Sequence, residues 1–397
     1  MSPRPTLELA DIFRQYGPAY RQTHPLPLHP RRVMRAIETC RTPELGGVVE
    51  FCDHCQHTHT RYRSCRERHC PTCQGEARLK WLQQRKAELL PTTYFHVVFT
   101  LPQPIAEIAF YNQQTLYQIL FRATAQTLLT IAADPKRLGV ELGFFCVLHT
   151  WGQNLHFHPH LHCVVPGGGL SPDQQNWITG RRRFFLPVRV LSRLFRRLFL
   201  EALEKAYAKG QLQFFGKLRS LYDPQAFADY LTPLREHEWV IYAKPPFGGP
   251  QHVIEYLGRY THRVAISNRR LLALHQDQVS FQWKDYRDGG KSKVMTLAAD
   301  EFIHRFLQHV LPPGFQRIRY YGFLANCHRA RKLELCRQLL ATACSALLPS
   351  LSDCHNFERA LATPNLRLCP WCGVGVLVCI QFLSPCRDFV PLRMDSS

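Results

Sequence analysis

The chain has 397 residues, 45% of them hydrophobic, which is enough to bury a large core and excludes an intrinsically disordered protein. Fifty Lys and Arg against thirty Asp and Glu give a formal net charge of +20 at pH 7, and the basic residues recur along the chain, which favours nucleic acid as the partner. No apolar stretch reaches the roughly 20 residues of a transmembrane helix, and no secretory leader or lipid anchor is recognised. We therefore expect a cytoplasmic protein without membrane contact.

The N-terminal part of the sequence predicts two helices followed by a small metal-binding unit. Apolar residues recur at helical spacing over 7–40, with a break at His24-Pro25-Leu26-Pro27. The stretch 40–75 loses this periodicity and is polar and rich in Cys, His and Arg, as small metal modules are. A helical linker is expected at 79–90. We therefore predict a first domain at 1–90, which contains a zinc-binding unit of the zinc-ribbon type.

Beyond residue 90, short β-branched or aromatic runs alternate with longer amphipathic runs. The expected strands are 94–100, 144–149, 161–165, 239–243, 279–283 and 293–297. The expected helices are 105–132, 188–209, 224–231, 252–262 and 298–310. Asp288-Gly289-Gly290 indicates a hairpin between the last two strands, which favours an antiparallel sheet. The sequence thus predicts an α+β domain at 91–332, followed by a helical C-terminal region with a Cys pair at 333–397.

Two C-x2-C pairs in the N-terminal unit predict a zinc site. Cys52 and Cys55 form the first pair, and Cys70 and Cys73 follow after fourteen intervening residues. Two pairs in this register typically supply the four thiolates of a structural Zn²⁺ site. The less favoured interpretation is four ordinary buried thiols.

Other residues of the Cys-rich stretches leave the number of zinc ions open. A second zinc site could be built from the remaining candidates, which are Cys40, Cys65, His69 and one of His54, His57 or His59. A third pair, Cys369 and Cys372, has Cys379 and Cys386 nearby, but the sequence predicts no site there. Arginines around Tyr62, including Arg66 and Arg68, suit contacts with DNA phosphates and bases; the alternative is that they only solvate a small domain.

Four histidines alternate with other residues over 156–162. Alternating residues of an extended strand project from one face, so His156, His158, His160 and His162 would converge and hold a divalent ion with open positions for a phosphate oxygen. The alternative, polar surface or satisfied core histidines, is common for a single His. Gln153 is the candidate we name for the third ligand, with Asn154 and His156 as alternatives, while His158 suits a supporting contact.

A short segment near residue 260 carries two tyrosines. Glu255–Arg263 reads as a helix, which places Tyr256 and Tyr260 one turn apart on the same face. A tyrosine can attack phosphorus and form a covalent phosphotyrosine. Arg259 and Arg263 have the same spacing and could hold flanking phosphates. The alternative is an amphipathic helix whose tyrosines pack in a core.

Four motifs together resemble transposases of the insertion sequence ninety-one family, over about residues 7–375. In chain order they are SCRERHCPTCQ, HTWGQNLHFHPHLHCVVPGGG, YLGRYTHRVAISNRRL and YYGFLANCHRARK. The resemblance implies a two-tyrosine, rolling-circle transposase with an HUH endonuclease core, in which the HUH motif falls on His160-Leu161-His162 and the nucleophiles on Tyr256 and Tyr260. It further implies Mg²⁺ or Mn²⁺ at His160 and His162, and cleavage of single-stranded element ends to a 5′-phosphotyrosine and a 3′-hydroxyl.

Two other functions stay open from the sequence. One is a zinc-dependent DNA-binding protein without catalysis, and the other is a plasmid replication initiator or relaxase with the same chemistry. Covalent attachment to DNA would distinguish a transposase from the DNA-binding protein. Element ends on both sides of the gene would distinguish it from the replication initiator or relaxase. In each case we expect a bacterial cytoplasmic protein that associates with the nucleoid when it is bound to DNA. The sequence leaves open whether the protein forms a homo-oligomer.

Overall fold

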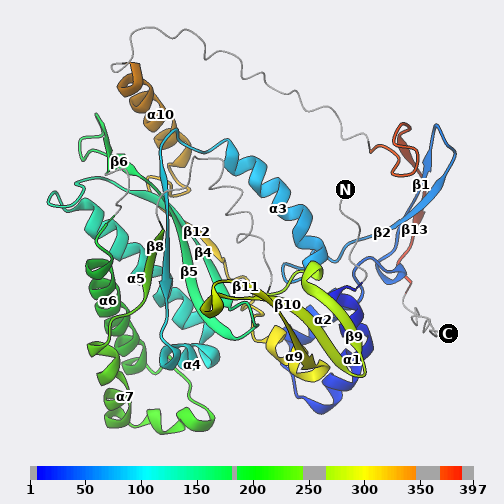
Figure 1. Ribbon diagram of the computed structural model, residues 1–397, viewed down its shortest axis with the longest axis horizontal. Coiled ribbons are helices and arrows are strands. Elements are labelled where there is room, and N and C mark those ends of the chain that lie inside the picture. The colour runs from blue at the N-terminus through cyan, green and yellow to red at the C-terminus, as the bar shows by residue number, and fades with distance from the viewer. Residues whose placement is uncertain (1–6, 181–185, 245–264, 346–366, 387–397) are drawn as a thin grey trace.

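A five-stranded antiparallel sheet forms the centre of the computed structural model, which describes residues 7–180, 186–244, 265–345 and 367–386 (Figure 1). Its strand order is β12-β4-β5-β3-β8, and every neighbouring pair is antiparallel. The strands are β3 (Tyr94–Thr100), β4 (Gly143–Trp151), β5 (Phe157–Pro166), β8 (Ile241–Lys244) and β12 (Ile318–Gly322). The predicted α+β class with an antiparallel sheet is confirmed.

Four helices cover one face of this central sheet. They are α4 (Gln103–Tyr111), α5 (Gln113–Ala133), α6 (Val188–Ala208) and α7 (Pro224–Glu236). Their apolar side chains join those of β3, β4 and β5 in the largest core, where Phe99 packs edge-on against Phe195. The single helix predicted over 105–132 is two helices. Asn112 separates them, because its backbone leaves the helical region and its side-chain amide bonds to the carbonyls of Ile108 and Gln213.

The opposite face of the sheet is covered in part by α3 (Pro71–Lys86). Trp81 packs edge-on against Phe145 with ring centroids 5.9 Å apart, and Arg85 lies over the ring of Tyr320 on β12. The helix starts earlier than the predicted linker because Pro71 occupies its first turn, where the missing N–H costs nothing. Alternating residues of β3, β4 and β5 point to this face, and the histidines of β5 are among them.

A second, smaller sheet packs with the N-terminal helices. It contains β9 (Leu271–His275), β10 (Gln278–Asp285) and β11 (Lys291–Ala298), and it buries apolar residues against α1 (Leu9–Thr23), α2 (Leu28–Glu38) and α9 (Ala299–Leu307). Phe13 and Phe306 meet edge-on at 5.4 Å. The predicted hairpin joins β10 to β11, with Gly289 and Gly290 at positive φ, which glycine adopts without strain.

A third sheet joins the two ends of the chain. It has the order β13-β1-β2, with β1 (Gly47–Cys52), β2 (Thr58–Tyr62) and β13 (Leu377–Leu383). The last strand therefore pairs with the first, far from the central sheet (Figure 1). The helix α10 (Arg329–Ser345) instead packs beside the central body, where Leu333 and Cys336 join Leu90 and Phe323.

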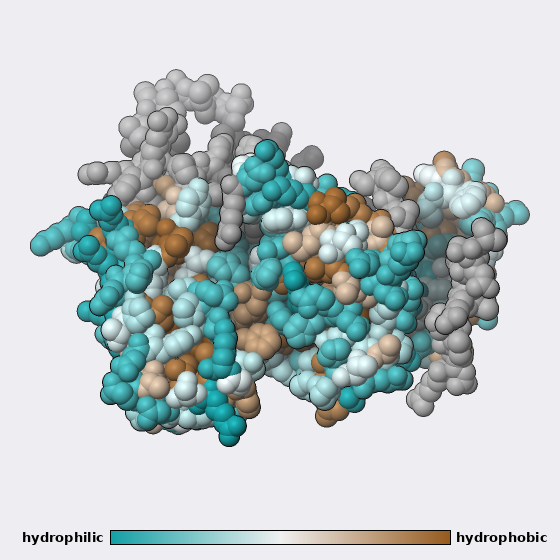
Figure 2. Space-filling model, turned by 60° about the horizontal axis from the view of Figure 1, so that its bottom comes forward, coloured by the Kyte–Doolittle hydropathy of each residue, from teal (hydrophilic) through white to brown (hydrophobic). Residues whose placement is uncertain are grey.

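Hydrophilic side chains cover most of the face of the molecule that Figure 2 draws. Figure 2 shows polar side chains over most of one face, with hydrophobic ones in separate patches, as expected for a chain with a net charge of +20. Within the stretches that the structure describes, no helix is both long enough and apolar enough to cross a membrane.

Candidate functional site

Four cysteines converge where α2 ends and α3 begins. We call Cys40, Cys65, Cys70 and Cys73 cluster I. The sulfur of Cys73 lies 3.6 Å from that of Cys40 and 3.5 Å from that of Cys65, and the Cys70 and Cys40 sulfurs are 3.8 Å apart. Four thiolates about 2.3 Å from a tetrahedral Zn²⁺ would be about 3.8 Å apart, whereas a disulfide would bring two sulfurs to about 2 Å. Cluster I therefore fits a structural zinc ion.

A second group of four cysteines joins the β1–β2 turn to the segment before β13. We call Cys52, Cys55, Cys369 and Cys372 cluster II. The sulfurs of Cys52 and Cys372 are 3.8 Å apart, and those of Cys55 and Cys369 are 3.7 Å apart, which again fits tetrahedral zinc. Gly375 closes over this cluster, since a Cβ there would lie 2.5 Å from the Cys52 sulfur.

The predicted grouping of the cysteines is wrong. The pairs Cys52/Cys55 and Cys70/Cys73 do not share one site, because the first meets the C-terminal pair across the sheet while the second meets Cys40 and Cys65. The expectation of no site at Cys369 and Cys372 is wrong for the same reason. The spacing of cysteines along the chain cannot reveal that β13, more than 300 residues away, pairs with β1.

His69, a predicted zinc candidate, belongs to neither cluster. Its Nδ1–H donates to Glu67 Oε1 at 2.7 Å, and its Nε2 accepts the backbone N–H of Leu311 at 3.1 Å. Burial lowers the pKa of His69, so the neutral ring serves once as donor and once as acceptor. The buried ring thus bonds the segment that carries cluster I to the loop that follows α9.

Three imidazoles meet on the α3 face of the central sheet, and we call His149, His160 and His162 the histidine centre. His160 lies directly opposite His149 in the β4–β5 pairing, and His162 follows on the same face of β5. The Nε2 atoms of His160 and His162 are 3.1 Å apart, and the His149 ring lies 4.5 Å from that of His162. One ligand nitrogen from each residue lies within 4.8 Å of the others, which fits a shared divalent ion.

Hydrogen bonds orient the two β5 histidines. His160 Nδ1–H donates to the carbonyl of His158 at 2.6 Å, which directs Nε2 into the centre. His162 Nδ1 lies 2.8 Å from Nε2 of the buried His96 on β3. Burial lowers the pKa of His160 to about 4, so its ring is neutral near pH 7 and has a lone pair for a metal. Sequence reasoning missed both His96 and His149, although alternation in their predicted strands was a usable signal.

Gln153 is the residue named from the sequence for the third ligand. It lies in the turn after Trp151, four residues beyond His149, and a strand advances about 3.3 Å per residue. Its carbonyl accepts a bond from Arg270. His149 is the third member of the group that could hold a metal ion. His156 is exposed near the turn, and the ring of His158 lies 5.3 Å from that of His160.

The predicted tyrosine helix lies outside the described residues, and with it Tyr256, Arg259, Tyr260 and Arg263. Of the two arginines named for DNA near the cysteines, Arg66 is exposed. The structure does not support that prediction for Arg68, because its guanidinium bonds to the carbonyls of a loop, at 2.7 Å for Pro312 and 2.5 Å for Phe315.

A groove of about 520 Å³ beside cluster II carries several basic side chains, and we call it the basic groove. Its basic and aromatic residues are Arg41, His59, Arg61, Tyr62 and Arg367. The buried carboxylate of Glu50 accepts two bonds from Arg61, which holds the pKa of Glu50 below its usual range and fixes that guanidinium. Positive charge around a phenol ring suits a nucleic-acid strand, whose phosphates and bases it would contact.

Comparison with known proteins decides which family this architecture represents. A family described as transposase zinc-binding domain matches residues 12–101, and one described as putative transposase matches 143–332. The putative transposase y4qJ of Sinorhizobium fredii is 60% identical over 94% of this chain and 95% of that protein. The chain belongs to the insertion sequence ninety-one family of transposases.

A more distant relative of this transposase is the transposase for insertion sequence element IS801 of Pseudomonas savastanoi pv. phaseolicola. It is 29% identical over 83% of this chain and 75% of that protein. No solved structure matches the chain. The zinc-binding match contains cluster I and half of cluster II, and the putative transposase match contains the histidine centre. The transposase thus acts on DNA and has a zinc-binding domain with clusters suited to structural Zn²⁺.

Proposed function

We propose that this transposase nicks and rejoins single-stranded DNA at the ends of an insertion sequence, by rolling-circle transposition through a 5′-phosphotyrosine. The observation that carries the proposal is the convergence of His149, His160 and His162, with two Nε2 atoms 3.1 Å apart on rigid neighbouring strands. Mg²⁺ or Mn²⁺ held there would polarise the scissile phosphate and offset its developing charge. Tyr256 or Tyr260 would supply the nucleophile.

In the proposed reaction, the phenol oxygen of Tyr256 or Tyr260 attacks phosphorus. The new O–P bond replaces the bond from phosphorus to the 3′ oxygen, and that oxygen leaves as a hydroxyl after it takes up a proton. Attack by a 3′-hydroxyl on the phosphotyrosine reverses the step and rejoins a strand without ATP. Arg259 and Arg263 would hold the flanking phosphates.

The zinc-binding part would hold the DNA. We assign one structural Zn²⁺ to cluster I and one to cluster II, on the basis of their sulfur spacings of 3.5–3.8 Å. The basic groove and the exposed Arg66 would contact the strand. We expect the protein to act in the cytoplasm, on the nucleoid while it is bound to DNA.

Trapping of a covalent adduct tests the proposal. The zinc-loaded protein, incubated with Mn²⁺ and labelled single-stranded element ends, should yield a denaturation-resistant protein–DNA band. The double variant Tyr256→Phe/Tyr260→Phe should yield none, while Tyr286→Phe, an exposed control in the short 3-10 helix after β10, should react like wild type. Tight DNA binding without any adduct would favour a zinc-dependent binding protein. Cleavage of plasmid origins but not element ends would favour a replication initiator or relaxase.

A further inference from the structure

We propose that the loop between two cysteines of cluster I, residues 66–69, is a positioning element for the histidine centre, acting through Arg68 and His69. The proposal rests on the function proposed above for that centre. It assigns the zinc cluster a second task besides folding the DNA-binding part: it sets the position of His149 and so the affinity of the centre for its metal.

The first link is Arg68, which lies between the cluster I residues Cys65 and Cys70. Its Nη1 donates to the carbonyl of Phe315 at 2.5 Å, and its Nη2 donates to those of Pro312 at 2.7 Å and Leu311 at 3.3 Å. Three carbonyls on one guanidinium fix the turn that follows α9. The planar guanidinium donates these hydrogen bonds in directions that a lysine ammonium group cannot reproduce.

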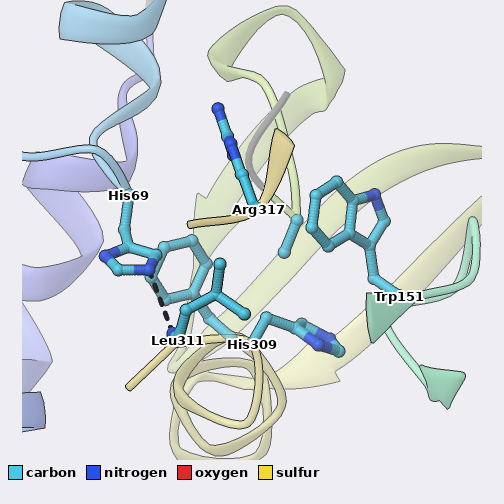
Figure 3. A pocket seen from close by; sticks show the side chains of 7 residues that line it. His69, Trp151, His309, Leu311 and Arg317 are labelled. Carbon is cyan, nitrogen blue, oxygen red and sulfur yellow. Dashed lines mark hydrogen bonds between the residues drawn. The ribbon is translucent and has the colours of Figure 1, made fainter. Parts of the chain in front are cut away.

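The second link is His69, the next residue. Figure 3 shows its ring bonded to the backbone of Leu311, with His309, Arg317 and Trp151 around the same small cavity. Because the neutral ring accepts at Nε2 while Glu67 holds Nδ1, the bond to Leu311 has a fixed direction. A side chain that contributed only packing would not need an acceptor nitrogen facing the N–H of Leu311.

The third link runs from residues 309–317 to both neighbours of His149. Thr150 Oγ1 lies 3.2 Å from His309 Nδ1, and the N–H of Leu148 donates to the carbonyl of Arg317 at 2.8 Å. His309 Nε2 also lies 3.0 Å from the carbonyl of Leu155, in the turn between β4 and β5. The segment that Arg68 and His69 hold therefore grips the strand on either side of a metal-ligand candidate.

The cavity in Figure 3 places these links together. It is lined by His69 from the zinc-binding part, Trp151 from β4, and His309 and Arg317 from the connecting segment. Ala265 also lines it, and this residue directly follows the stretch that contains the two candidate tyrosines. One contact region thus borders the zinc loop, the metal-ligand strand and the start of the chain after the tyrosines.

The experiment compares Arg68→Met with Arg66→Met, an exposed neighbour on the same loop. Mn²⁺ binding to the zinc-loaded protein is followed by electron paramagnetic resonance, with zinc content, oligonucleotide Kd and nicking measured on the same samples. We expect Arg68→Met to keep its zinc and its oligonucleotide Kd, to bind Mn²⁺ about 10-fold more weakly or worse, and to nick with a lower kcat at little-changed KM. Arg66→Met controls for Mn²⁺ binding alone, in which it should match wild type, since its proposed role is in DNA contact.

A second pair of variants separates positioning from folding. His69→Gln keeps an acceptor for the Leu311 N–H and should retain most of the Mn²⁺ affinity, while His69→Leu should lose it. If Arg68→Met fails to fold or loses its zinc, the comparison of His69→Gln with His69→Leu tests the inference. Equal Mn²⁺ binding by wild type, Arg68→Met and His69→Leu overturns the inference. No Mn²⁺ binding by wild type instead defeats the proposed histidine centre.

Discussion

His96 Nε2 lies 2.8 Å from His162 Nδ1 within the central sheet, and the two rings are nearly parallel, 10° apart. His96 is 2% exposed, so this bond is shielded from water. Such a partner fixes which nitrogen of a metal-binding histidine faces the metal. It therefore sets the direction of the His162 Nε2 lone pair.

Replacing His96 by Leu should weaken Mn²⁺ binding and slow nicking by about 10-fold to 100-fold, because His162 loses its orienting bond. His96→Gln, which can still bond to Nδ1, should fall between Leu and wild type. Isothermal titration with Mn²⁺ and single-turnover nicking check this, with exposed His237→Leu as the control. Wild-type behaviour of His96→Leu would contradict an orienting role.

His149 and Gln153 make a second test, since each is a candidate for the third ligand. His149→Ala should reduce Mn²⁺ affinity at least 10-fold, because a two-imidazole site holds a divalent ion more weakly. Gln153→Ala should change it by less than about twofold, since Gln153 lies in the turn beyond β4. The reverse order of effects would restore the sequence-based assignment.

Zinc analysis should find two zinc ions in each wild-type chain. The double variant Cys369→Ser/Cys372→Ser should keep one, because cluster I does not use these residues. The exposed Cys379→Ser should keep both. Inductively coupled plasma mass spectrometry on metal-purified protein measures this, and complete zinc loss in the double variant would show that the clusters are not independent.

Stability should fall as the solution is acidified, in part through His309. Burial lowers the pKa of His309 to about 4 from an ordinary value near 6.5, so the unfolded chain binds more protons between these values. The stabilisation is therefore complete above pH 6.5 and is lost towards pH 4, with a size on the order of 3 kcal/mol. Urea unfolding at pH 7.5 and 5 should show a smaller acid loss for His309→Gln than for wild type. Burial also lowers the pKa of His160, so the His309→Gln variant should still lose some stability on acidification.

The basic groove predicts a salt-dependent DNA contact. Arg41→Gln/Arg367→Gln should bind single-stranded oligonucleotides more weakly, and the slope of log K against log salt should become shallower by roughly 0.7 for each phosphate contact removed. Arg219→Gln, exposed in the turn before α7, should leave the slope unchanged. Fluorescence anisotropy across salt concentrations measures it. An unchanged slope in the double variant would place the DNA elsewhere.

Local patterns in the sequence predict the elements of this fold well. The run of β-branched and aromatic residues at 94–100 is a strand with those bounds, and the hairpin at Gly289 and Gly290 joins the expected strands. Period-two alternation also identifies His160 and His162, because the pleat alone puts them on one face. Such features depend only on neighbours in the chain.

Features that depend on pairing between distant segments were missed. His149 joins His160 only through the register of β4 against β5, and His96 joins His162 only because β3 lies on the other side of β5. The cysteine pairs were wrongly grouped for the same reason. Spacing along the chain cannot tell which C-x2-C pair meets which across a sheet.

The pairing of Cys52 and Cys55 with Cys369 and Cys372 also has a consequence for synthesis. During translation, the first two thiols are synthesised more than 300 residues before their partners, so cluster II closes a very long loop. The β13-β1-β2 sheet can be completed only after β13 is synthesised, by which point every strand of the central sheet has been synthesised. A chain cut short before Cys369 would keep the residues of the histidine centre but would leave Cys52 and Cys55 without their partner thiols, as an open half of the metal site.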